Sequence, residues 1–142
     1  MSNRFRLIGT ASFVAAALFC ARAGDKKPAV DTSKLPPPSD KKGVTYEADI
    51  KPIFEASCVK CHSGPKPKGK LLMDTLPHIL KGGEDGKVID PGNSAASMLV
   101  INIAHLGDED DYMPPPKNKE KIGPLTKEQI GLIRAWIDQG AK

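Results

Sequence analysis

Aromatic residues are scarce in this chain, and their scarcity limits what the chain can be. The sequence has one tryptophan, two tyrosines and four phenylalanines, and three of the phenylalanines lie within the first 23 residues. The aromatic side chains left for the rest of the chain are Tyr46, Phe54, Tyr112 and Trp136. They are not interleaved with a basic stripe, which argues against binding of nucleic acid. A small domain with so little aromatic volume has a marginal core, so we expect a further apolar body to complete it.

Acidic residues are absent from residues 1–23, where Arg4 and Arg6 precede a mainly apolar run that is too short to span a membrane comfortably. A small-residue cleavage pattern, Ala21-Arg22-Ala23, follows this run, so the segment is predicted to be a cleaved signal peptide. We therefore expect export to the periplasm and no membrane span after cleavage. The alternative is a membrane anchor, either the uncleaved segment or a lipid on Cys20.

Removal of the signal peptide changes the charge on which any electrostatic argument depends. The chain has 21 basic and 17 acidic residues, and three of the basic ones lie in the signal peptide, so the mature charge is +1. The basic character of the precursor is therefore no reason to expect nucleic acid as a partner.

Apolar residues are also few in residues 24–43, where lysine, proline, aspartate and serine dominate. This composition predicts a disordered tether. The remaining residues, 44–142, contain neither the alternation typical of strands nor an internal repeat. Their apolar residues recur at helical spacing, which predicts an all-α domain of three to five short helices joined by long loops.

The first and last helices have the clearest signals. The first runs into Cys58, and it either begins after an Asp49 cap or begins at Tyr46 and kinks at Pro52. The last follows a capping box formed by Thr126 and Gln129. Its apolar face consists of Ile130, Ile133, Trp136 and Ile137. Two further helices are expected, one from Asp74 or Thr75 to Gly82 and one from Asn93 or Ser94 to Gly107.

Cysteine is scarce as well, because only Cys58 and Cys61 remain after signal cleavage, and His62 follows them directly. Two cysteines one helical turn apart can form thioethers with the two vinyl groups of one porphyrin, and the adjacent imidazole can then ligate the iron. Export agrees with this interpretation, since haem c is attached outside the cytoplasm. A covalent haem would also provide the missing apolar body of the core.

Three other interpretations of the motif stay open at this point. A redox dithiol would need a depressed thiol pKa and a thioredoxin-like surrounding, and the latter is missing. A zinc site could add His78 and His105 to the two cysteines, although their spacing fits no zinc-finger pattern. An ordinary structural disulfide is possible in an exported protein, with the histidine exposed in a loop.

A thioether or a second imidazole could complete the coordination of a haem iron. The candidates in the sequence are Met73, Met98, Met113, His78 and His105. Met73 and Met98 are expected to pack in the core, and His78 to lie at the surface. Met113 precedes three consecutive prolines, which stiffen an otherwise irregular loop. We therefore expect Met113 as the distal ligand, with His105 as the runner-up.

The Cys58–His62 motif, the later Met113-Pro114-Pro115 and the closing LTKEQIGLIRAWIDQGAK together resemble a class I cytochrome c. More narrowly, residues 44–142 resemble the planctomycete-type cytochrome c domain, in which a segment like that from Pro91-Gly92 to Leu99 precedes the Met-Pro-Pro loop. The resemblance implies one covalent haem c, with His62 proximal and Met113 distal to the iron. It also implies that the first and last helices pack together.

This resemblance leads us to expect an exported monohaem one-electron carrier that is not an enzyme. Such a monomer would exchange electrons with a separate redox protein donor and acceptor. The alternative is a haem-based sensor or small-ligand binding protein with an open distal site. A bacterial haem peroxidase of the usual type would need a second Cys-x-x-Cys-His motif, which the sequence does not contain.

Overall fold

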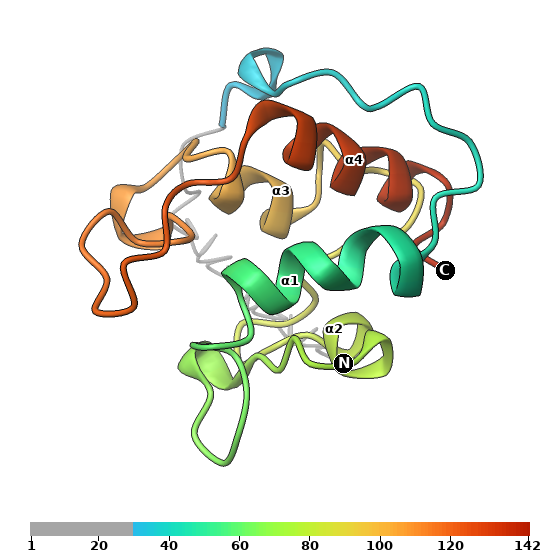
Figure 1. The fold of residues 1–142 in the computed structure, drawn as a ribbon. Helices are drawn as coiled ribbons and strands as arrows, with labels where there is room; N and C mark the ends of the chain where they lie inside the picture. The colour runs from blue at the N-terminus through green and yellow to red at the C-terminus, as the bar shows by residue number, and fades with distance from the viewer. Residues whose placement is uncertain (1–29) are drawn as a thin grey trace, which may run out of the picture.

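The computed structural model describes residues 30–142, and these residues form an all-α domain without strands, as expected (Figure 1). The predicted signal peptide, Cys20 and the first six residues of the predicted tether lie outside the described residues. The α-helices are α1 (Lys51–Ser57), α2 (Leu76–Lys81), α3 (Met98–Ile103) and α4 (Lys127–Asp138). The shorter helical turns are η1 (Thr32–Lys34), η2 (Tyr46–Ile50), η3 (Lys68–Lys70) and η4 (Glu109–Asp111). Within residues 30–142, no helix has both the length and the apolar character needed to cross a bilayer.

The chain enters α1 through η2, a wider π-helical turn that begins at Tyr46. The Thr45 side chain caps this turn by accepting from the backbone N–H of Ala48. Pro52 then lies in the first turn of α1, where its missing N–H costs little. Of the two starts left open by the sequence, the structure has the one at Tyr46; Asp49 does not cap the helix, because its carboxylate accepts from the backbone N–H of Thr45 at 3.0 Å.

The last helix, α4, begins where the sequence predicts. The Thr126 hydroxyl accepts from the backbone N–H of Gln129 at 3.2 Å, and the Gln129 side chain accepts from the N–H of Thr126 at 2.9 Å. This reciprocal pair satisfies two backbone donors that the first turn leaves without helical partners. The predicted apolar face is buried as expected.

The first and last helical segments pack together through aromatic side chains, as the resemblance implies (Figure 1). The ring of Trp136 lies 6.0 Å from that of Tyr46 and 6.2 Å from that of Phe54, measured between centroids. The carbonyl of Lys142 accepts from the indole N–H of Trp136 and from the backbone N–H of Tyr46. The end of the chain is therefore fastened to the start of the helical domain.

Residues 35–43, which we call the strap, lie along α4 rather than forming part of a disordered tether (Figure 1). The Arg134 guanidinium donates to the carbonyl of Pro36, and the backbone N–H of Ser39 donates to the carbonyl of Gly131 at 2.9 Å. The prediction is therefore corrected for this segment. A polar, proline-rich segment has few apolar side chains to bury, but a helix elsewhere in the chain can still form hydrogen bonds with the backbone of that segment.

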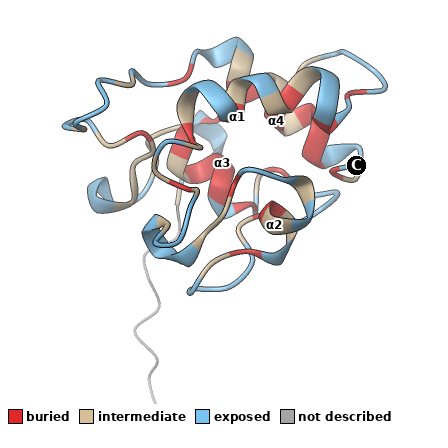
Figure 2. Ribbon diagram, turned by 60° about the horizontal axis from the view of Figure 1, so that its bottom comes forward, coloured by how far each residue is buried: buried red, intermediate tan, exposed pale blue. Residues whose placement is uncertain are grey.

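The two middle helices differ in how well the sequence predicts them. Helix α2 follows Thr75 and ends at Gly82, whose φ of +86° favours glycine, as expected. Helix α3 is shorter than expected, because Ser94 does not begin it. The backbone N–H and hydroxyl of Ser94 both donate to the carboxylate of Asp138 in α4, at 2.8 and 3.0 Å. Buried residues gather where α1, α3 and α4 face one another (Figure 2).

Candidate functional site

The Cys-x-x-Cys-His motif forms a tight turn directly after α1. Cys58 is the C-cap of α1, and its backbone N–H donates to the carbonyl of Phe54 at 2.8 Å. The backbone N–H groups of Cys61 and His62 both donate to the carbonyl of Cys58, at 3.1 and 3.0 Å. One backbone turn therefore fixes both thiols and the imidazole relative to one another.

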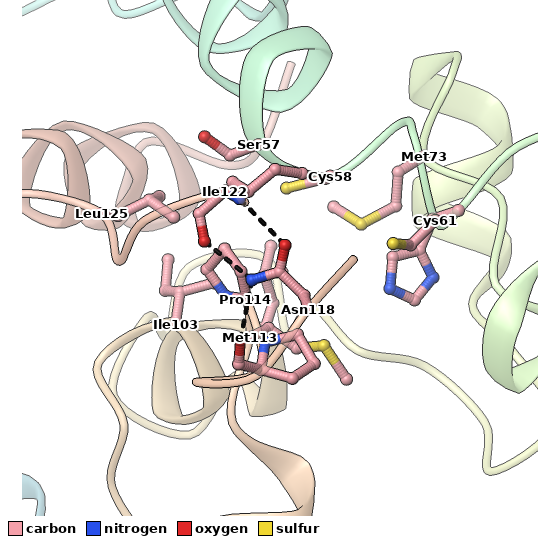
Figure 3. A pocket seen from close by; sticks show the side chains of 13 residues that line it. Ser57, Cys58, Cys61, Met73, Ile103, Met113, Pro114, Asn118, Ile122 and Leu125 are labelled. Atoms are coloured by element: carbon pink, nitrogen blue, oxygen red, sulfur yellow. Dashed lines mark hydrogen bonds between the residues drawn. The ribbon is translucent and has the colours of Figure 1, made fainter. Parts of the chain in front are cut away.

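This turn borders an apolar cavity, which the chain closes from the opposite side with the loop after η4. Figure 3 shows Cys61 and Met73 on one side of the cavity, facing Met113 and Pro114 on the other. The walls include Ser57, Cys58, Cys61, His62, Met73, Leu99, Ile103, Met113, Pro114, Pro115, Asn118, Ile122 and Leu125. Residues more than 50 positions apart in the sequence thus surround one apolar space beside the motif.

A second and larger hollow, of about 410 Å³, shares His62 and Met113 with the apolar cavity. Its walls are more polar and carry charges of both signs, from Lys68, Lys87, Glu84, Asp85 and Asp111. His62 and Met113 therefore lie at the boundary between the apolar cavity and the polar hollow.

His62 is held in an orientation that suits a metal ligand. Its side chain is buried, and its Nδ1 lies 3.2 Å from the carbonyl of Leu71. A carbonyl only accepts, so Nδ1 carries the proton and Nε2 keeps its lone pair. Burial lowers the pKa of His62, which favours the neutral imidazole that binds metals. The backbone carbonyl of His62 accepts from Met73 at 2.8 Å, which fixes the turn further.

Of the two expected distal ligands, the structure brings only Met113 to the cavity walls. The backbone N–H of Met113 donates to the carbonyl of Asn102 in α3 at 3.0 Å. The ring of His105 instead stacks on that of Tyr112, with centroids 4.6 Å apart and planes 5° from parallel. His105 lines neither of the two hollows described above.

Of the three remaining candidates, Met98, Met73 and His78, only Met98 lies in surroundings that differ from those expected. Met98 is 42% exposed on α3 and borders the polar hollow, so the expectation of core packing is wrong. Met73 is buried as expected, but it also lines the apolar cavity. His78 lies near the surface, where its Nδ1 is 2.7 Å from a carboxylate oxygen of Asp74.

The three alternative interpretations of the motif lack structural support. Among the described residues, no three His, Cys, Asp or Glu side chains gather closely enough to hold a metal ion, so the zinc set with His78 and His105 does not form. Burial raises the pKa of the Cys58 thiol to about 12, the opposite of what a reactive dithiol needs. Cys58 and Cys61 are free thiols rather than a disulfide.

Several residues at the cavity were not singled out from the sequence. Leu99, Ile103, Ile122 and Leu125 supply its apolar walls, and Asn118 supplies an amide. Isolated aliphatic residues in loops carry no periodic signal, and an asparagine in a loop is ordinarily a turn residue. Only the folded arrangement identifies them.

An all-α domain in which a Cys-x-x-Cys-His turn faces a methionine-bearing loop across an apolar cavity has the architecture of a cytochrome c. Residues 58–117 match the model of the family described as Planctomycete cytochrome C. This match supports a planctomycete-type cytochrome c domain, a family that implies covalently bound haem c and electron transfer. Searches among curated proteins and among solved structures gave no match to the chain.

Proposed function

We propose that this chain is an exported monohaem cytochrome c that carries one electron at a time between two separate redox proteins. One observation carries the proposal. A single cavity is lined by Cys58, Cys61 and His62 from one turn and by Met113 from a distant loop. The sequence contains one Cys-x-x-Cys-His motif, which supports one haem per chain. The leader-like residues 1–23 support export.

The residues at the cavity fit the chemistry of a covalently attached haem. Cys58 and Cys61 would supply the thioethers, the free Nε2 of His62 would ligate the iron, and the thioether of Met113 would complete its coordination. When bound, the haem supplies a reversible one-electron couple. The apolar walls would exclude water, and a histidine–methionine pair favours a relatively high reduction potential.

The two hollows differ in polarity, as the two edges of a porphyrin do. The vinyl groups that form thioethers lie on the edge opposite the carboxylate-bearing propionates. A haem bound through Cys58 and Cys61 would therefore direct its carboxylates away from these two cysteines. The polar hollow borders His62 and Met113, and Lys68 and Lys87 in its walls would be the partners of these carboxylates, beside the acidic side chains of Glu84, Asp85 and Asp111.

Carbon monoxide binding separates a carrier from a haem sensor. A carrier with Met113 on the iron should show the weak long-wavelength absorption band of iron–methionine ligation when oxidised. Its ferrous form should bind carbon monoxide poorly, because the distal position is filled. High-spin ferric iron and ready binding of carbon monoxide would contradict the proposal and favour a sensor with an open distal site.

A further inference from the structure

The loop that carries Met113 is tied to itself by one side chain, that of Asn118 (Figure 3). The amide nitrogen of Asn118 donates to the carbonyls of Pro115 and Ile122, both at 2.8 Å. The amide oxygen accepts from the backbone N–H of Ile122 at 2.9 Å. All three bonds are partly buried, and all three residues line the apolar cavity.

Few backbone hydrogen bonds hold this loop in place. Proline has no backbone N–H, so Pro114, Pro115 and Pro116 cannot donate to a neighbouring strand or turn. Between η4 and α4 the chain has no regular secondary structure beyond turns and bends. On the α3 side, the loop is held by the bond from Met113 to Asn102. On the other side, the links across the loop are the bonds of the Asn118 amide and one backbone bond, from the N–H of Lys121 to the carbonyl of Asn118 at 3.3 Å.

Only an asparagine side chain provides this set of bonds at this reach. The site needs two donors for two carbonyls and one acceptor for an N–H. A carboxylate of the same shape keeps the acceptor but loses both donors, and it places a negative charge against two carbonyl oxygens. Loss of a partly buried bond leaves its partner unsatisfied, which favours any loop conformation that exposes the partner to water.

We propose that Asn118 is the positioning residue for Met113, closing the loop over residues 113–122 so that the thioether stays at the cavity wall. The inference rests on the proposed function, in which Met113 ligates the haem iron. Without the amide, the loop opens more often, and the distal position becomes accessible to external ligands. Asn118 thereby controls how accessible the distal position is to external ligands, without itself contacting the iron.

Imidazole titration of the ferric holoprotein tests this role. Asn118→Asp should bind imidazole at least about tenfold more tightly than the wild type, because ligand affinity follows the population of the open form. Haem attachment, measured by the pyridine haemochrome spectrum, should be unchanged, since Cys58 and Cys61 hold the haem covalently. The matched control is Asn93→Ala. Asn93 also uses its amide in a turn, accepting from Ala96 at 3.2 Å, but the turn lies away from the cavity.

A double variant shows whether Asn118 acts through Met113. Met113→Ala alone should bind imidazole tightly, and adding Asn118→Asp to it should cause no further change. Wild-type affinity in Asn118→Asp, with tight binding in Met113→Ala, would overturn the role of Asn118 and leave the proposed function intact. Equal affinity of wild type and Met113→Ala would overturn the distal assignment itself. Should Asn118→Asp fail to accumulate as holoprotein, Asn118→Ser carries the same expectation and the same refutation.

Discussion

Replacement of Trp136 by alanine tests the packing that supports the cavity. The indole is fully buried, and it contacts the rings of Tyr46 and Phe54, which lead into the Cys-x-x-Cys-His turn. Truncation of a buried tryptophan to alanine typically lowers the free energy of unfolding by about 3–5 kcal/mol. The change also removes the donor to the carbonyl of Lys142, although that carbonyl keeps its bond from Tyr46. We therefore expect a loss within this range rather than above it.

The variant Trp136→Phe separates the cost of the lost apolar volume from the cost of the lost hydrogen bond to Lys142. Phenylalanine keeps most of the apolar volume but loses the donor to Lys142, so its cost should be about 1–2 kcal/mol. Urea unfolding of the holoprotein, followed by far-UV circular dichroism, measures both variants on the same scale. Met98→Ala is the control, because its exposed side chain should change the free energy of unfolding by no more than about 0.5 kcal/mol. A loss below about 1 kcal/mol for Trp136→Ala would refute the proposed packing.

Two further perturbations test the haem and the strap. The double variant Cys58→Ala/Cys61→Ala, freed of haem, should lose cooperative thermal unfolding, because the aromatic-poor core then lacks its largest apolar component; a sharp two-state transition in circular dichroism would argue against this. Gly131→Ala would place a Cβ atom 2.8 Å from the carbonyl oxygen of Pro37. It should destabilise the domain by about 1–3 kcal/mol and speed proteolysis within the strap, whereas an unchanged cleavage rate would contradict the strap contact.

Features set by neighbouring residues in the sequence were predictable. The capping box of Thr126 and Gln129 places the start of α4 because both partners lie within one helical turn. The Cys-x-x-Cys-His turn is equally local. The choice of Met113 over His105 came from the three prolines that follow it. The structure agrees with that preference only in placing Met113, and not His105, at the walls of the cavity.

Features set by distant partners were not predictable in this way. Ser94 is a good helix-capping residue, but Asp138, 44 positions later, takes both its N–H and its hydroxyl. The strap has a composition typical of disorder, yet Arg134 binds its backbone from almost 100 positions away. Met98 fits the helical periodicity of α3, but periodicity cannot tell which face a neighbouring segment will cover. The hydrogen-bond partners of the Asn118 amide are set by the folded loop around it and could not be predicted from the sequence.

The central proposal is that Met113, together with His62, would ligate the haem iron. Spectroelectrochemical titration of Met113→Ala holoprotein tests it most directly, with Met73→Ala as the control, because that methionine also lines the cavity. Met113→Ala should lose the iron–methionine band, and its reduction potential should fall by more than about 100 mV, where about 59 mV is a tenfold change for one electron. Met73→Ala should keep the band. Survival of the band in Met113→Ala, with an unchanged potential, would contradict the assignment.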